Sequence, residues 1–159
     1  LDDIERCFVA VEDGADVAYG TRAHPDSAFR RTQPVYRVVS GRVFNRLLRL
    51  LGLTADRDTQ CGLKGFRADV ADRVFAALVT NGFAFDVEAL ARADRAGYSV
   101  QTVPVNWAHV EASRVRAFRD GIDMARAALN IRRTLAREAR TQRTDAPVIG
   151  APEADLLDL

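Results

Sequence analysis

The densest group of chemically capable side chains in the 159-residue sequence reads RDTQCGLKGFR and runs from Arg57 to Arg67. It places a carboxylate, a hydroxyl and an amide side by side in a loop hinged by glycines, just before a short apolar stretch. Asp58 is the acidic group that could act on a substrate there. An ordinary polar turn has the same composition, so the residues alone leave both interpretations open.

A second group, FAFDVE, carries the carboxylates of Asp86 and Glu88 at the predicted start of a helix. Residues two apart do not share a helix face, so the two are not an evident general acid–base pair. One of them could point into a cleft. The alternative is that Asp86 is simply the N-cap of the helix.

Basic side chains form the third group. Arg22 follows a predicted strand, and Arg30 and Arg31 come soon after it. Guanidinium groups bind phosphate through paired hydrogen bonds, although a solvated basic loop would look the same. Farther along, the segment VPVNWAHVEASR carries His109 and Arg114. His109 could ligate a metal only with partners that the neighbouring sequence does not supply.

The elements that must position these groups alternate between helices and strands, which predicts an α/β fold. Apolar residues at helical spacing predict five helices, the third capped by Asp69 and the fourth beginning at Asp86. They cover residues 2–13, 34–51, 69–78, 86–97 and 114–137. Strands are predicted over residues 16–21, 63–67 and 98–105. We expect one domain over residues 1–137 and a disordered tail over residues 138–159.

The formal net charge of +1 hides two basic stretches, at residues 22–53 and 101–143, which suit an anionic ligand. The sequence has no apolar run of the roughly 18 residues that a membrane-spanning helix needs. Its start lacks the pattern of a signal peptide. Cys7 and Cys61 are too few for a disulfide framework, and with His24 and His109 they show no zinc-site spacing. The aromatic residues are not interleaved with the arginines, so nucleic-acid binding is not expected.

Four segments together are similar to a known family. The segments YGTRAH, RDTQCGLKGF, FAFDVEALARADRAGY and VPVNWAHVEASRVR stand in the order and spacing found in family-2 glycosyltransferases that act on polyprenyl phosphates. The likeness is to dolichyl-phosphate β-glucosyltransferases and their bacterial relatives. It covers about residues 1–135, and DTQCG and FDVE are its most specific parts.

This resemblance implies a GT-A fold, whose first half binds the nucleotide sugar and a divalent metal, Mg²⁺ or Mn²⁺. The metal-binding Asp-x-Asp motif of the family lies just before the segment that resembles the start of this sequence, and the sequence does not contain it. We therefore expect the chain to be the C-terminal, acceptor-side half of such an enzyme, inactive alone. An exposed sheet edge predicts marginal stability or homo-oligomers.

The resemblance also implies the reaction, which is transfer of a hexose, glucose from UDP-glucose, to a polyprenyl or dolichyl phosphate with inversion. It assigns the acceptor phosphate to Arg22, Arg30 and Arg31, and a donor or acceptor phosphate to Arg114. Asp86 is the expected catalytic base and Asp58 the second acidic candidate. His109 lies where some GT-A enzymes carry a metal ligand.

The lipid acceptor implies contact with a membrane surface, and we expect peripheral attachment at the cytoplasmic, inner face. The amphipathic helices over residues 34–51 and 114–137 could lie on an anionic headgroup layer, although ordinary packing helices would share their pattern. The alternative to a transferase is a non-catalytic module that binds a lipid phosphate and lacks the nucleotide-sugar site.

Overall fold

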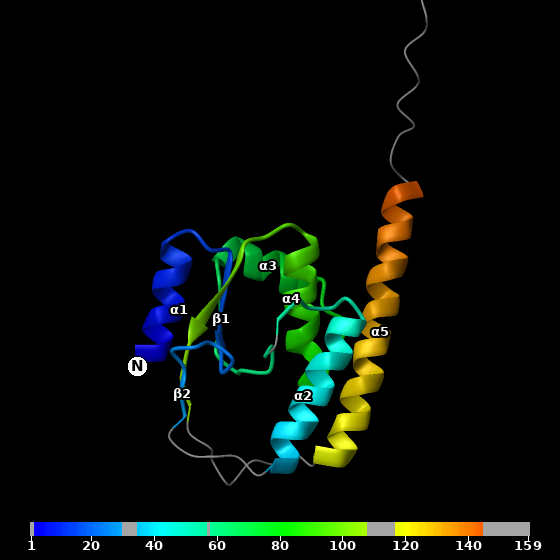
Figure 1. Ribbon diagram of the computed structural model, residues 1–159. Coiled ribbons are helices and arrows are strands. Elements are labelled where there is room, and N and C mark those ends of the chain that lie inside the picture. Colours follow the sequence, from blue (N-terminus) through cyan, green and yellow to red (C-terminus); the bar gives the residue numbers. More distant parts are fainter. Residues whose placement is uncertain (1, 30–34, 57, 108–116, 145–159) are drawn as a thin grey trace, which may run out of the picture.

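The computed structural model describes residues 2–29, 35–56, 58–107 and 117–144. Helices and strands alternate along the chain, which confirms the α/β class (Figure 1). In chain order the elements are α1 Asp2–Glu12, β1 Val17–Thr21, β2 Ala28–Phe29, α2 Val35–Leu50, β3 Lys64–Phe66, α3 Ala68–Ala76, the 3₁₀ helix η1 Gly82–Ala84, α4 Phe85–Arg95, β4 Val100–Pro104, β5 Asn106–Trp107 and α5 Ala117–Thr144.

The main sheet has three strands in the order β3-β1-β4. β1 lies in the middle, antiparallel to β3 and parallel to β4. The register sets Tyr19 of β1 opposite both Lys64 of β3 and Thr102 of β4. A separate parallel pair joins β2 to β5.

All five residues of β1 are buried, because helices cover both faces of the sheet. Successive side chains of a strand point to opposite faces, and the packing follows that rule. Val17 and Tyr19 pack against α3 and α4, whereas Ala18 packs against Cys7 and Ala10 of α1. Burial on both sides explains why β1 is a continuous run of small and apolar residues rather than an alternating one.

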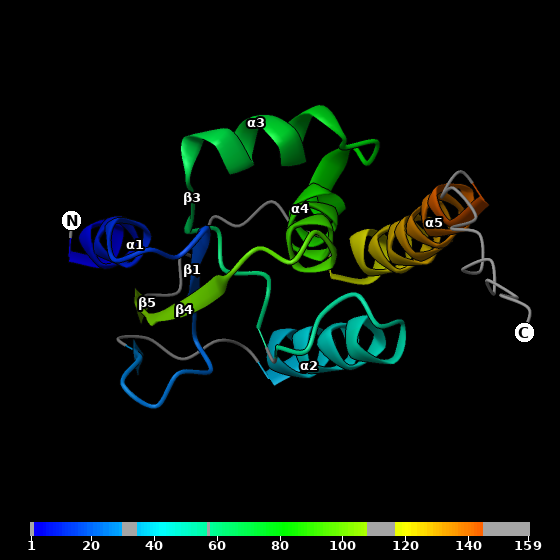
Figure 2. The ribbon, with the colours of Figure 1, turned by 90° about the horizontal axis from the view of Figure 1, so that it is seen from above.

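A second core lies on the far side of α4 from the sheet, where α2, α4 and α5 meet. Leu48 of α2, Val87 of α4 and Ile131 of α5 are each almost wholly buried in it. Figure 2 shows α1 on one side of the sheet and α4 on the other, with α2 beside α4 and α5 farther out beyond them. Helix α4 therefore joins the two cores.

The predicted helix and strand positions are mostly confirmed, and the ends of two helices are explained by glycine. Gly14 after α1 and Gly52 after α2 have φ values of 108° and 64°, which glycine adopts at little cost. The strands β2 and β5 were not predicted separately, since two-residue strands carry no periodic pattern.

The predicted cap at Asp69 is wrong, and so is the alternative that Asp86 is the N-cap of its helix. No side chain caps α3 or α4, whose N-cap residues are Arg67 and Ala84. The Asp69 carboxylate instead accepts hydrogen bonds from Arg67, at 2.6 and 3.0 Å. The Asp86 carboxylate accepts one from Lys64. In each case the carboxylate pairs with a cation and the N-cap position is left without a side-chain hydrogen bond.

The predicted tail begins too early, because α5 continues to Thr144 and residues 138–144 are helical. A long-range ion pair anchors this last part: Arg92 of α4 donates to both carboxylate oxygens of Glu138, at 2.9 and 3.0 Å. The remaining predicted tail residues, 145–159, lie outside the described residues, as do residues 114–116 of the predicted last helix.

Candidate functional site

Three segments that carry the predicted acidic and basic residues converge at the carboxyl end of β1. Thr21 ends this strand and Arg22 follows it. The loop before β3 passes the same end, because β3 runs antiparallel to β1, and it carries Asp58. The start of α4 reaches the same loop through Asp86 and Lys64. Ligands of open α/β sheets bind outside the carboxyl ends of the strands, so this convergence defines the candidate site.

Arg22, which is partly buried, and Asp58, which is buried, form an ion pair with two parallel hydrogen bonds. Arg22 Nε lies 2.7 Å from Asp58 Oδ2, and Arg22 Nη2 lies 2.7 Å from Asp58 Oδ1. The backbone N–H of Arg22 donates to Oδ2 at 2.9 Å, and that of Gln60 donates to Oδ1 at 3.3 Å. Both carboxylate oxygens are thus engaged, and they fix the direction of the Arg22 guanidinium.

This arrangement also sets the charge state of Asp58. Burial acts to raise the pKa of the Asp58 carboxyl, but the hydrogen bonds and the charge of Arg22 outweigh it and hold the pKa below its usual value. Asp58 therefore remains an anion that positions Arg22. A carboxylate with both oxygens occupied and a lowered pKa is poorly suited to accept a proton from a substrate.

Asp86 makes an ion pair with Lys64, the sole lysine of the sequence. Lys64 Nζ lies 3.0 Å from Asp86 Oδ2 and 2.6 Å from the carbonyl oxygen of Cys61. The two side chains are only 10% and 14% exposed. An ammonium fits this position as a compact point charge, whereas the planar guanidinium of arginine would need more room.

Two buried side-chain atoms in the described part of the chain lack a hydrogen-bond partner. They are Asp86 Oδ1, an acceptor, and Gln60 Nε2, a donor. Buried polar atoms are nearly always hydrogen-bonded in native proteins. Gln60 belongs to the segment DTQCG and Asp86 to the segment FDVE. A substrate group or a water molecule could supply the missing hydrogen-bond partner of each atom.

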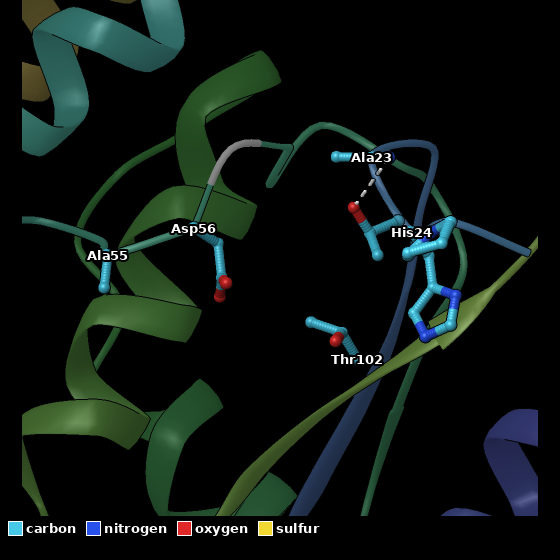
Figure 3. A pocket seen from close by; sticks show the side chains of 7 residues that line it. Ala23, His24, Ala55, Asp56 and Thr102 are labelled. Carbon is cyan, nitrogen blue, oxygen red and sulfur yellow. Dashed lines mark hydrogen bonds between the residues drawn. The ribbon is translucent and has the colours of Figure 1, made fainter. Parts of the chain in front are cut away.

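A hollow of about 310 Å³ is lined by Thr21 and Ala23, which precede and follow Arg22 in the sequence, and by Asp56, two residues before Asp58. Figure 3 shows Asp56, Thr102 and His24 facing it from three sides. The hydroxyl of Tyr19 donates a short hydrogen bond to Asp56 Oδ2. Burial, followed by this hydrogen bond, raises the pKa of Tyr19 well above its usual value, so the hydroxyl keeps its proton.

Glu88, the other carboxylate of the FDVE segment, is fully buried and belongs to a structural network. It accepts hydrogen bonds from Thr80 N at 2.8 Å, from Val79 N at 3.3 Å and from Arg92 Nε at 2.7 Å. Arg92 in turn binds Glu138 of α5. Glu88 thus ties the loop before η1 to α4 and α5, away from the candidate site.

The other predicted binding residues, Arg30, Arg31, Arg114 and His109, lie outside the described residues, and their roles stay predictions.

Within the described ranges, no three His, Cys, Asp or Glu side chains gather as a set of metal ligands. Cys7 and Cys61 are buried free thiols. None of the described helices combines the length and the apolar character needed to cross a membrane.

The sequence analysis did not identify Lys64, Tyr19 and Asp56 as residues of the candidate site. Lys64 lies 22 positions from Asp86 and Tyr19 lies 37 from Asp56, so no local pattern joins either pair. The available signal for Lys64 was its uniqueness in a chain whose other basic residues are all arginine.

Comparison with known proteins points to one group of enzymes, although no protein-family model matches the chain. It is 32% identical to a dolichyl-phosphate β-glucosyltransferase of Drosophila melanogaster over 110 residues, which is 69% of this chain and 34% of the relative. The enzyme of that name from Saccharomyces cerevisiae is 33% identical over 119 residues, 73% of this chain and 35% of the relative. A polyprenol monophosphomannose synthase of Mycolicibacterium smegmatis is 29% identical over 111 residues, 69% of this chain and 42% of the relative. The chain spans about a third of the length of the first two relatives.

Proposed function

The chain belongs to the family-2 glycosyltransferases of the dolichyl-phosphate β-glucosyltransferase type, and on that premise we propose that it takes part in transferring a hexose to a polyprenyl or dolichyl phosphate. Glucose from UDP-glucose is the proposed donor group, and inversion at the anomeric carbon the proposed outcome. In this proposal the chain is the acceptor side of a GT-A fold. The relatives include both glucosyl- and mannosyl-transferring enzymes by name.

The observation that carries the proposal is the Arg22–Asp58 pair at the carboxyl end of β1. A phosphate monoester that attacks a nucleotide sugar must approach a second anion, the diphosphate leaving group. A guanidinium held in place before the substrate arrives offsets that repulsion without reorganising. Asp58 supplies this preorganisation, since its two oxygens fix Arg22 through its Nε, its Nη2 and its backbone N–H.

The acceptor oxygen needs little help from a base, because the second pKa of a phosphate monoester is about 6. In the reaction, a phosphate oxygen forms the new bond to the anomeric carbon as the bond from that carbon to the nucleotide diphosphate breaks. We assign Asp86 to orienting the reacting groups through its buried Oδ1, with Lys64 holding the other oxygen. Arg30, Arg31 and Arg114 remain proposed phosphate ligands.

Mg²⁺ or Mn²⁺ is part of the proposal as the cation that neutralises the diphosphate leaving group. The described residues offer no set of three ligands for it. None of them is therefore assigned to the metal, and His109 remains a proposed ligand from the resemblance.

Peripheral attachment to the cytoplasmic face of a membrane is the proposed location. Helix α2 supports it, because the helix has no acidic residue and its exposed side chains combine a basic and an apolar flank. The exposed apolar residues are Val35, Tyr36, Val39, Val43 and Leu50, and the exposed arginines include Arg42, Arg46 and Arg49. Co-sedimentation of the protein with phosphatidylglycerol vesicles tests this, and Val43→Asp should weaken it. Equal recovery with purely zwitterionic vesicles would contradict electrostatic attachment.

The transfer reaction is tested with the full-length protein, radiolabelled UDP-glucose and a polyprenyl phosphate. Arg22→Ala should lower the rate by about 10²–10³-fold, the usual loss when one preorganised donor is removed. Asp58→Asn should give a similar loss with a raised KM for the acceptor, because Arg22 then loses its anchor. Arg73→Ala, an exposed arginine of α3, is the matched control. Wild-type transfer unaffected by Arg22→Ala would refute the assigned role. Binding of polyprenyl phosphate without transfer would favour the non-catalytic module.

A further inference from the structure

The hollow beside Arg22 has a floor built by one face of the sheet. Tyr19 and Thr21 are two apart on β1, and Thr102 is the register partner of Tyr19 on β4. Side chains two apart on a strand, and partners across a pair of strands, share one face. Thr21 and Thr102 therefore line the hollow from the sheet, while Asp56 and His24 line it from the two loops.

The polar groups around the hollow include hydrogen-bond acceptors and donors that have no partner among the other described residues. Asp56 uses Oδ2 for the Tyr19 hydroxyl, and no described residue donates to its Oδ1. The Thr102 hydroxyl likewise makes no hydrogen bond within the described ranges. His24 Nδ1 accepts the backbone N–H of Asp26 at 3.2 Å, which places the proton of a neutral ring on Nε2.

The remaining lining is small and apolar, from Ala23, Pro25 and Ala55. None of the described residues that line the hollow is an arginine or a lysine, so this part of the lining offers no cation to a phosphate or a diphosphate. Its volume of about 310 Å³ is at the lower end of the roughly 300–1,000 Å³ of small-molecule sites. A neutral ring with several hydroxyls and small apolar faces matches this combination of size, charge and polarity.

We infer that this hollow binds the hexose ring during transfer, with Asp56 and Thr102 as residues that read its hydroxyl groups. The inference rests on the proposed function and extends it to a sugar subsite. Arg22 is flanked in sequence by two residues of the lining, Thr21 and Ala23. A ring in the hollow therefore lies next to the backbone of Arg22, whose guanidinium is the proposed phosphate ligand.

The test compares Thr102→Val, Asp56→Asn and Thr141→Val in the full-length protein. Valine has the shape of threonine without its hydroxyl, and Thr141 is an exposed residue of α5 that serves as the control. Transfer from UDP-glucose, UDP-galactose and GDP-mannose to a polyprenyl phosphate gives the donor selectivity. Saturation-transfer NMR with methyl β-D-glucopyranoside reports on sugar binding independently of transfer.

Asp56→Asn should lower kcat/KM for UDP-glucose by about 10–100-fold and Thr102→Val by about 3–10-fold, the ranges for one charged and one neutral hydrogen bond. Both substitutions should reduce the differences in kcat/KM among the three sugar donors and leave the KM for the polyprenyl phosphate unchanged. Circular dichroism shows whether each variant folds. If Asp56→Asn does not fold, the donor kinetics of Thr102→Val alone decide whether the hollow is a sugar subsite. Unchanged donor kinetics in folded variants would overturn the subsite and leave the transferase proposal standing.

If the wild type transfers no sugar, the proposed function fails, and the NMR measurement still decides on the hollow. A glucoside signal that weakens in Thr102→Val but not in Thr141→Val supports a sugar subsite. No signal with the wild type overturns it.

Discussion

Replacing Glu88 by glutamine is the sharpest test of how this fold is held together. Glu88 is completely buried and accepts three N–H groups, from Thr80, Val79 and Arg92. Glutamine has nearly the same shape and keeps one acceptor oxygen. Its amide nitrogen, however, faces N–H donors where the second carboxylate oxygen stood, and the negative charge beside Arg92 is lost.

The size of the effect follows from these contacts. A buried donor left without a partner costs about 1–3 kcal/mol. Arg92, whose side chain is 11% exposed, keeps only Glu138, which is 43% exposed and screened by water. Weakening this ion pair adds about 1 kcal/mol. We therefore expect Glu88→Gln to lower the free energy of unfolding by about 2–4 kcal/mol, a large part of the roughly 5–15 kcal/mol typical of a domain.

Urea unfolding followed by circular dichroism measures this loss. The matched control is Glu138→Gln, which removes the exposed carboxylate from the same arginine and should cost about 0–1 kcal/mol. The m-value should stay constant, because the folded state remains compact. A Glu88→Gln loss no larger than that of Glu138→Gln would refute the reasoning that burial makes Glu88 the essential partner of Arg92.

Two further predictions concern packing and acidity. Gly20→Ala should cost about 1–3 kcal/mol in the same assay, because its Cβ would lie 2.5 Å from Val105 Cγ1 and 3.0 Å from Cys61 Sγ, whereas a Cβ at Gly62 meets nothing within 4 Å. Equal stability of Gly20→Ala and Gly62→Ala would contradict this. Burial acts to raise the pKa of Asp58 and Glu88, but their hydrogen-bond partners hold both values below those of the unfolded chain. The two ionised carboxylates therefore stabilise the fold above their pKa values in the unfolded chain, near pH 4, and this stabilisation is lost as the pH falls through their pKa values in the folded chain. The free energy of unfolding should fall between pH 5 and pH 3, and a rise over this range would contradict the prediction.

Much of the fold follows from local pattern. Apolar spacing locates α1 and α2, because each must bury one face, and the glycines after them mark their ends. The buried run of β1 is visible for the same reason. That neither Asp69 nor Asp86 caps its helix could not be inferred, because Arg67 and Lys64 bind those carboxylates only in the folded chain. Such cation partners override a local capping preference, and one of them is far away in sequence.

The end of α5 and the candidate site depend on contacts between distant segments. Nothing near Glu138 shows that Arg92 of another helix will bind it, so the charged sequence there resembled a tail. In the site, the sequence supplied Arg22, Asp58 and Asp86 as separate candidates. It could not show that Asp58 binds Arg22, because that pair joins the loop before β3 to the end of β1. Nor could it show that Lys64 binds one oxygen of Asp86, because that pair joins β3 to the start of α4.

These pairings change which acidic residue a substrate could use. Asp58 has both oxygens on Arg22 and Gln60, so a substrate proton would have to displace a hydrogen bond that holds the guanidinium. Asp86 retains one buried oxygen without a partner in the described part of the chain. A phosphate nucleophile is ionised near neutral pH and has no proton to give up, whereas a sugar hydroxyl would require a base. The firmly anchored guanidinium of Arg22 suits a phosphate acceptor, and with such an acceptor the open oxygen of Asp86 has an orienting role rather than the removal of a proton. For this reason the proposed function rests on the positioned arginine rather than on a catalytic base.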